Sequence, residues 1–451
     1  MLFACSIPFS AVENPAFVRF CKLLRAGYKL PSRKLIGDNL LDTVNDNLEE
    51  DMKTAISGKT ATYIEDGWSN IHNEPVIASC LQVEGKNYFL ESYEAKAMTK
   101  SAENLVAKSK EMIKIAEEKY NCKVKTMVTD NAKNMENMRK ALKEEDDSLV
   151  VYGCSAHWLN LLGQDVTPRS VMKHVVEIQK YFRNHHKPNA WLSECDNSRK
   201  PIIPGDTRWK SQLNSLDSYT HNRPHFMKIV QDHGDDMDKN IVKKIMDNSL
   251  FKNARDLAER LRPIAIALDI CQSDSSSLAD ATHLWIKLAS NDLLQTVAVK
   301  SAVQRRKKQA LTPEHLVAYT IHPKYQGQLL NGDEMEIVNQ WLMDKNPEFI
   351  STIIAYRAKS MPFPHSFFTE SAIELHPVTW WKGVKSAEIP SEFIDIANQL
   401  LSAPCSSAAI ERIFSNFSYI HSKIRNRLKP DKASKLVFCY RMLRGSKDLD
   451  Y

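Results

Sequence analysis

The chain has 451 residues, of which 43% are hydrophobic and 26% are charged, with a formal net charge of +6. This length exceeds one ordinary hydrophobic core, so we expect two or three domains, and the composition excludes a disordered or fibrous chain. The mild basic excess permits nucleic-acid binding without requiring it, because basic and acidic residues are interspersed along the sequence.

Residues 1–58 are predicted to form short helices, broken near Pro15 and Pro31, that pack on the rest of the fold. Apolar residues recur at helical spacing from Phe17 to Leu24 and again from Leu40 to Leu48. None of these residues is of a type or spacing that carries chemistry. We therefore interpret residues 1–58 as a helical lead-in.

From Thr60 the pattern changes to strands alternating with helices. The predicted strands lie at 61–64, 76–83, 88–93, 124–128 and 149–152, with a hairpin turn at 84–86. Helices are predicted from about 101 to 120 and from 132 to 143. The order β-β-β-α-β-α-β indicates a mixed sheet with helices on both faces.

Asp66 and Asp130 are each expected where a strand ends, at the sheet edge where open α/β folds place their sites. Two carboxylates on adjacent strand ends can share a hard cation such as Mg²⁺. Each aspartate could equally cap a turn or a helix, and residue preference alone favours that interpretation.

After residue 165 the strand pattern stops, and residues 166–377 are almost wholly helical by pattern. Leu257, Leu261, Ile264 and Leu268 form one predicted core face. The basic run from Arg305 to Lys308 fits nuclear import, a phosphate contact or a solvated helix end.

A late helix is predicted over 407–421, with Pro404 before it and Ser406 or Ser407 as its cap. Its apolar face comprises Ile410, Ile413, Phe414 and Phe417. Glu411 lies beside that face, either on the surface or directed into a site. Because glutamate is rarely buried without a partner, residue preference favours the surface.

Other residues have both a structural and a functional interpretation. Cys154 and His157 are spaced as an incomplete metal pair, and a buried structural pair is favoured. Arg208 beside Trp209 could bind a phosphate or stack on a base. The structural alternative, which the sequence alone favours, is a solvated arginine beside a partly buried tryptophan. Nine scattered cysteines without a C-x-x-C pair indicate a reducing, intracellular compartment. No apolar run reaches the roughly 18 residues of a membrane span, so no membrane partner is expected.

Several motifs, taken in order, resemble those of the hAT superfamily of DNA transposases and of the proteins domesticated from them. The resemblance covers roughly residues 55–445, and residues 30–190 also look like an uncharacterised transposase-like domain of that family. The motifs are Asp66-Gly67-Trp68-Ser69, Thr129-Asp130-Asn131-Ala132-Lys133-Asn134-Met135, Cys154-Ser155-Ala156-His157, Thr207-Arg208-Trp209, Pro377-Val378-Thr379-Trp380-Trp381 and Ser406-Ser407-Ala408-Ala409-Ile410-Glu411-Arg412-Ile413-Phe414-Ser415.

The resemblance implies a ribonuclease-H-like mixed-sheet core, interrupted by a large all-helical insertion, with C-terminal helices that return to the core. The implied domains are 1–58 (lead-in), 59–165 (first part of the core), 166–385 (insertion) and 386–451 (core helix and dimerisation region). It also implies that Asp66, Asp130 and Glu411 form an acidic triad that binds two Mg²⁺ or Mn²⁺ ions for DNA strand cleavage and transfer. This implication reverses the preference for a surface Glu411.

By the same resemblance, Cys154, His157, Arg208 and Trp209 are expected near DNA, where Trp209 could stack on an extruded base. Ile413, Phe414 and Phe417 are expected to serve the core or a partner chain, and with Leu436 and Tyr440 they are the predicted dimerisation residues. The expected partners are DNA and a second copy of the chain, in the nucleus.

Active family members usually carry an N-terminal zinc finger that binds transposon ends, and this chain has no Cys/His quartet for one. That departure argues against autonomous transposition. Two functions therefore stay open: a transposase-type phosphoryl transferase, and a domesticated, non-catalytic nuclear protein acting through dimerisation and contacts with DNA or protein.

Overall fold

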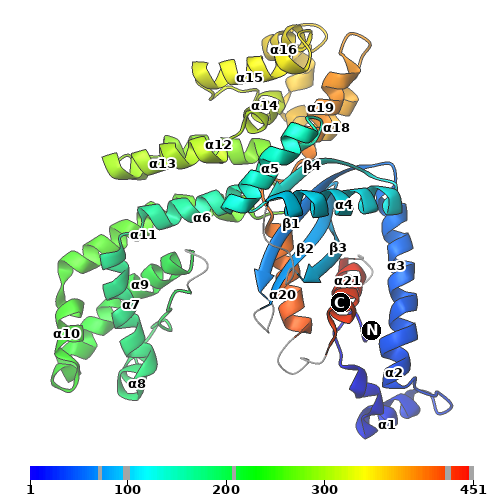
Figure 1. The fold of residues 1–451 in the computed structure, drawn as a ribbon. Coiled ribbons are helices and arrows are strands. Elements are labelled where there is room, and N and C mark those ends of the chain that lie inside the picture. Colours follow the sequence, from blue (N-terminus) through cyan, green and yellow to red (C-terminus); the bar gives the residue numbers. More distant parts are fainter. Residues whose placement is uncertain (70–73, 95–101, 206–209, 422–427, 446–451) are drawn as a thin grey trace. The chain divides into compact units, whose positions relative to one another are not determined.

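Figure 1 shows a computed structural model of the chain, which describes residues 1–69, 74–94, 102–205, 210–421 and 428–445. The chain divides into two compact units. The first comprises residues 1–154, 381–385 and 390–451, and the second comprises 155–380 and 386–389. The second unit begins before residue 166, where the predicted insertion starts. Compact units need not coincide with domains, so the predicted domain boundaries stay predictions.

The first unit is built on a five-stranded sheet of order β3-β2-β1-β4-β5. Strands β1, β2 and β3 pair antiparallel, whereas β4 pairs parallel with both β1 and β5. The predicted mixed sheet is therefore confirmed. The strands are β1 (Thr60–Ser69), β2 (Pro75–Val83), β3 (Lys86–Glu94), β4 (Lys123–Thr129) and β5 (Val150–Gly153).

The predicted hairpin connects β2 to β3 through a two-residue turn. Glu84 and Gly85 both have positive φ, at 50° and 77°, as a turn that matches the twist of the flanking strands requires. Strand β1 is longer than predicted, because its antiparallel pairing with β2 continues to Ser69 opposite Pro75. Asp66 therefore lies within β1 rather than after it.

Helices cover both faces of the sheet, as the strand and helix order predicts (Figure 1). On one face Glu65 accepts a hydrogen bond from Ser109 of α4, and on the other Trp68 contacts α20. The two side chains face opposite ways because side chains alternate along a strand. The helices of this unit are α1 (Pro15–Leu24), α2 (Arg33–Leu35), α3 (Leu41–Ile56), α4 (Ala102–Tyr120), α5 (Lys133–Glu145), α19 (Ser391–Ser402), α20 (Ala408–Ile420) and α21 (Pro430–Gly445), with short turns η1 (Phe9–Glu13) and η2 (Ile36–Leu40).

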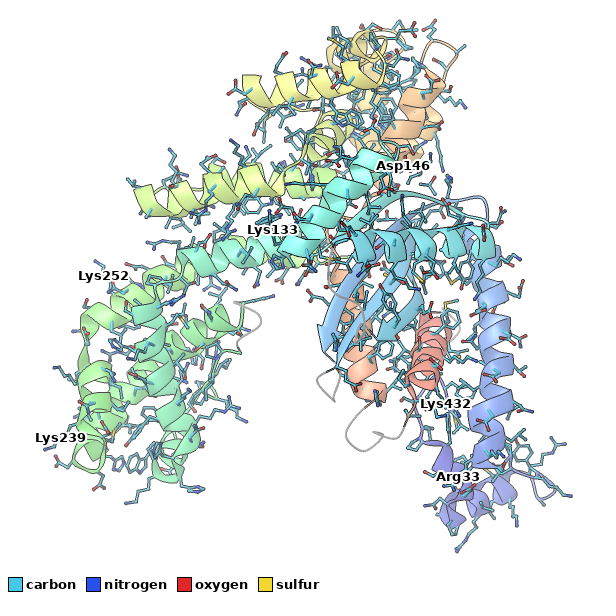
Figure 2. The ribbon with its side chains drawn as sticks, viewed as in Figure 1. Arg33, Lys133, Asp146, Lys239, Lys252 and Lys432 are labelled. Atoms are coloured by element: carbon cyan, nitrogen blue, oxygen red, sulfur yellow. The ribbon has the colours of Figure 1, made fainter. Side chains whose placement is uncertain are left out.

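The C-terminal segment returns to the sheet, as predicted. The Gln399 amide on α19 donates to the carbonyl oxygen of Lys125 in β4 at 2.7 Å, and the Tyr152 hydroxyl on β5 donates to the carbonyl oxygen of Pro404 at 2.7 Å. Lys432 on α21, labelled in Figure 2, forms an ion pair of 2.8 Å with Asp38. These contacts join residues that lie more than 200 positions apart in the sequence.

The lead-in packs less than predicted. Helix α1 begins at Pro15 and has no buried residue, and Phe20, Leu23 and Leu24 are more than half exposed. The expectation that this apolar stripe packs on the rest of the fold is therefore wrong for α1. Helix α3 does pack, since Leu41 and Leu48 are buried.

In the part of the second unit that the structure describes, the regular elements are all helices, joined by loops. Leu257, Leu261, Ile264 and Leu268 are buried on α11, which confirms that predicted face. No helix in the described residues is both long and apolar enough to span a bilayer. The helices are α6 (Ser155–Val166), α7 (Arg169–Asn184), α8 (His186–Ser193), α9 (Lys210–His233), α10 (Lys239–Met246), α11 (Asn248–Cys271), α12 (Leu278–Ala289), α13 (Val297–Ala310), α14 (Pro313–Ile321), α15 (Gly332–Lys345), α16 (Phe349–Ala358), α17 (Glu370–Ile373) and α18 (Pro377–Gly383), with short turns η3 (Gly234–Asp236), η4 (Asp292–Leu294) and η5 (His365–Phe368).

Candidate functional site

Asp66 and Asp130 lie side by side at one end of the parallel part of the sheet. The parallel register of β1 and β4 ends at Glu65 opposite Thr129, and the two aspartates are the next residues on each chain. Both line a cavity of about 360 Å³, together with residues of β2 and of the N-terminal turns of α4 and α5. The structure therefore brings together the two aspartates that the sequence singled out.

The cavity concentrates negative charge. Burial, together with the charges of Asp130, Glu411 and Glu65, raises the pKa of Asp66 to about 8, despite the lowering effect of the Gly67 backbone N–H. That N–H donates to Asp66 Oδ1 at 2.7 Å. Like charges that share a site disfavour each other's ionisation. The Asp66 carboxylate is therefore a group that a cation would stabilise.

The loop that carries Asp130 is held by a hydrogen-bond network. Arg139 on α5 donates to the Thr129 hydroxyl at 2.6 Å and also to the Asp130 carbonyl oxygen. The Asn131 amide donates to the Cys154 carbonyl oxygen at 2.8 Å. A side chain at Gly153 would overlap the Asn131 amide oxygen, so Asn131 would have to leave its position to admit one. The backbone at Asp130 is thereby fixed against β5.

Glu411 lies in the first turn of α20, whose start is joined to the same network. The Ser407 N–H donates to the buried Cys154 thiol at 3.4 Å, and the Ser406 hydroxyl accepts from the Ala408 N–H at 3.4 Å. Ser407 makes no side-chain cap, so Ser406 is the predicted cap that forms. Asp130 and Glu411 are thus positioned through a common contact, Cys154.

The three carboxylates are not assembled into one closed ligand set. Glu411 influences Asp66 electrostatically but is not among the residues lining the cavity. Across the part of the chain that the structure describes, no three His, Cys, Asp or Glu side chains are grouped so as to hold a metal ion. The arrangement is two adjacent aspartates with a third carboxylate within electrostatic range.

Glu65 is a fourth carboxylate that the sequence reasoning missed. It is fully buried, lines the same cavity and accepts hydrogen bonds from Tyr63 at 2.7 Å and Ser109 at 3.1 Å. Its Oε1 atom has no hydrogen-bond partner among the described residues, and burial raises its pKa to about 7. Alternation along β1 was the available signal, because it places Glu65 on the same side of the strand as the buried Tyr63.

The structure describes two of the four residues that are expected near DNA, Cys154 and His157. Cys154 is buried, with 3% of its surface exposed, and its thiol contacts Ser407, so its observed role is in packing. His157 is half-buried on α6 in the second unit. Arg208 and Trp209 lie outside the described residues. A role of these four residues near DNA stays a prediction.

Most of the predicted dimerisation residues face the interior of their own chain. Ile413, Phe417 and Leu436 are buried, and the Trp68 ring stacks on Phe414 with centroids 4.4 Å apart. These side chains cover the sheet because α20 and α21 return to it. The burial of these three residues fits the core alternative, and their role in dimerisation stays a prediction. Phe414 and Tyr440 stay half-exposed.

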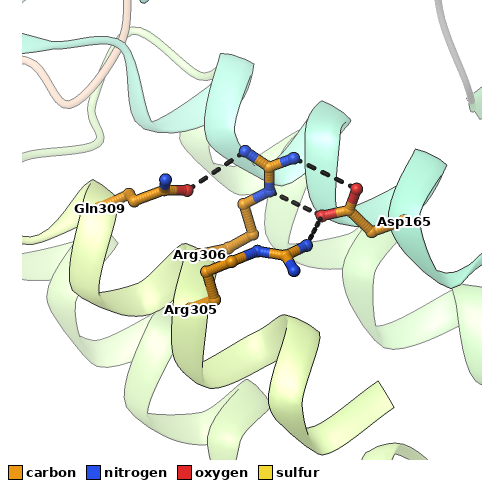
Figure 3. Close-up of polar contacts among 4 residues, drawn as sticks. All are labelled: Asp165, Arg305, Arg306 and Gln309. Carbon is orange, nitrogen blue, oxygen red and sulfur yellow. Dashed lines mark hydrogen bonds and ion pairs between the residues drawn. The ribbon is translucent and has the colours of Figure 1, made fainter. Parts of the chain in front are cut away.

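Two carboxylates pair with three of the four cations of the basic run on α13 within the second unit. Figure 3 shows Arg305 and Arg306 both bound to Asp165 of α6, with Nη2 and Nε 2.8 and 2.7 Å from the same carboxylate oxygen. Lys307 forms an ion pair of 2.6 Å with Glu334. These contacts join helices, so they support a structural interpretation over import or phosphate binding.

Two families match the sequence. The first, "Domain of unknown function (DUF659)", matches residues 31–182, and the second, "hAT family C-terminal dimerisation region", matches residues 360–443. No curated protein matched the sequence. A solved structure, the Drosophila P element transposase strand transfer complex, aligns with 97% of this chain and 91% of its own at 11% identity, with a TM-score of 0.34. That score is too low to carry an argument about fold or function. The two family matches, in the order expected from the motifs, show that the chain belongs to the hAT-type transposases and the proteins derived from them.

Proposed function

We propose that this protein binds DNA and dimerises, and that Asp66, Asp130 and Glu411 support metal-dependent DNA strand cleavage and transfer. The observation that carries the proposal is the pairing of Asp66 with Asp130 in one cavity, with Glu411 close enough to raise the pKa of Asp66. We propose a ribonuclease-H-like core for the same unit. The hairpin-first mixed sheet, with helices on both faces, supports that fold.

The residues at the cavity fit a hard divalent cation. Its ionisable lining groups are carboxylates, without cysteine or histidine, and carboxylate oxygens are the ligands of Mg²⁺ and Mn²⁺. Asp66 and Asp130 would hold the ion, with Glu411 completing the set. When bound, such ions supply Lewis-acid activation of the attacking oxygen and stabilisation of the leaving oxygen.

The chain's own residues prepare this site by orientation. The Gly67 N–H fixes one oxygen of Asp66, and the Ala132 N–H holds Asp130 Oδ1 at 3.2 Å. Arg139 secures the Asp130 backbone from behind. A carboxylate whose rotamer is fixed beforehand loses less freedom when a cation or substrate binds.

A second candidate is a domesticated protein that binds DNA and dimerises without catalysis. The observation that favours it is the lack of a grouped three-ligand set anywhere in the described chain. In both candidates DNA and a second copy are the partners, and the nucleus is the proposed location. The dimerisation-region match supports the second copy.

The two candidates separate in a cleavage assay on the full chain. We expect duplex DNA to be nicked in the presence of Mg²⁺ or Mn²⁺, and we expect Asp130→Asn to abolish nicking. Asp395→Asn, an exposed aspartate on α19 of the same unit, is the matched control and should cleave normally. A Mn²⁺-induced rise in melting temperature that Asp130→Asn removes would report metal binding independently. Absence of both signals, with dimerisation and DNA binding intact, selects the non-catalytic candidate.

A further inference from the structure

A stripe of four cations runs along helix α7 of the second unit. Arg169, Lys173, Lys180 and Arg183 are all exposed. At 3.6 residues per turn they fall within a sector of about 80° and extend over about 21 Å of helix. The opposite side of α7 is apolar and buried, through Val175, Ile178 and Phe182. We call these four cations the α7 stripe.

The charge of the α7 stripe is not neutralised by the surrounding structure. Within the described ranges, no carboxylate forms an ion pair with any of the four side chains. Helix α7 has one acidic residue, Glu177; Lys244 of α10 engages it at 2.7 Å, and the charge of Lys173 also contributes to lowering its pKa, which leaves the other three cations of the stripe without a carboxylate on this helix. The stripe therefore presents a net positive line to solvent, in contrast to Arg305 and Arg306, which share Asp165.

Helix stability does not explain this arrangement. Arg169 and Lys173 are four residues apart, and Lys180 and Arg183 three apart, spacings at which like charges weaken a helix by roughly 0.2–0.5 kcal/mol per pair. The helix dipole disfavours Arg169 in the first turn and favours Arg183 in the last turn, so it gives the four cations no net stabilisation. A line of charge that costs helix stability is expected where it meets an anionic partner.

We propose that the α7 stripe binds the phosphate backbone of duplex DNA. The proposal rests on the proposed function, because it names where that DNA contacts the second unit. Lysine offers a compact ammonium group to phosphate oxygens, and arginine offers a guanidinium group that can donate two parallel hydrogen bonds to them. The stripe contains no aromatic side chain, so it lacks the stacking platform that single strands use. It also lacks the Trp, Phe or Leu face with which an amphipathic helix enters a membrane.

The expected effect can be worked out from counterion release. Each phosphate contact contributes about −0.9 to the slope of log K against log salt concentration for duplex DNA. Lys173→Gln with Lys180→Gln removes two contacts, so the slope should become less negative by about 1.8. At about 0.1 M salt that difference corresponds to a loss of affinity of roughly 60-fold.

The test measures the affinity of the full chain for a labelled DNA duplex of arbitrary sequence by fluorescence anisotropy, at a series of salt concentrations. A double variant of exposed lysines elsewhere in the unit, Lys287→Gln with Lys300→Gln, should keep the wild-type slope. Equal melting temperatures verify that both variants fold. Single-stranded DNA of the same length and anionic phosphatidylserine vesicles serve as alternative ligands.

Two results would overturn the inference. One is a Lys173/Lys180 variant with unchanged slope and affinity for duplex DNA. The other is a variant that loses affinity only for single strands or for vesicles. If instead the wild-type chain shows no salt-sensitive affinity for duplex DNA, the proposed function fails with it, so the two failures are distinguishable.

Discussion

Replacing Glu65 by glutamine tests whether a buried negative charge limits the stability of the candidate site. The pKa of Glu65 is raised from 4.5 to about 7. Between these pH values the folded chain holds a proton that the unfolded chain has released, so this residue makes stability fall as pH rises. The difference between a pKa of 4.5 and one of about 7 corresponds to about 3 kcal/mol above pH 7. Below pH 4.5 the effect is absent.

Glutamine has the shape of protonated glutamate and keeps an oxygen for Tyr63 and Ser109. We therefore expect Glu65→Gln to be near neutral at about pH 4.5 and to raise the free energy of unfolding by up to about 3 kcal/mol at about pH 8. Urea denaturation followed by circular dichroism at the two pH values measures the difference. Glu118→Gln, an exposed residue on α4, is the control. A stabilisation that is equal at both pH values, or a loss at the higher one, would refute the reasoning.

Two further substitutions test the packing around the site. Gly153→Ala places a methyl group on the Asn131 amide oxygen and should lower the free energy of unfolding by about 1–3 kcal/mol. Gly332 has open space around the position of a Cβ atom, so Gly332→Ala should change stability little and serves as the control. Equal melting temperatures of the two variants would contradict the first expectation. Trp68→Ala removes the ring stacked on Phe414 and should lower the free energy of unfolding by roughly 3 kcal/mol. The change in tryptophan fluorescence on unfolding should also become smaller. A stability within roughly 0.5 kcal/mol of wild type, the size of an ordinary surface substitution, would show that α20 does not depend on this contact.

Local pattern was sufficient where a single element decides the outcome. The five strands and the Glu84-Gly85 turn could be predicted from alternation and turn residues. The buried face of α20 could be predicted from helical spacing. The adjacency of Asp66 and Asp130 was predictable because parallel neighbouring strands end at the same sheet edge.

Sequence patterns did not predict burial, ion pairing or strand length where these depend on residues distant in the sequence. Helical spacing predicts the apolar stripe of α1, but burial requires a facing surface that the fold does not supply. Arg305 and Arg306 form a basic run in the sequence, yet both are paired with Asp165, some 140 residues earlier. The extent of β1 past Asp66 depends on β2, whose pairing carries it to Ser69.

The sequence by itself determined the family, the strand and helix order, and the two aspartates that meet at the sheet edge. Only the tertiary structure decided that Cys154 joins the Asp130 loop to the start of α20, and that Glu65 is buried beside Asp66. It also showed that Ile413 and Phe417 pack on their own sheet. The physical reason is that periodicity reports which side of an element is apolar, whereas burial and pKa depend on what the rest of the chain places against it.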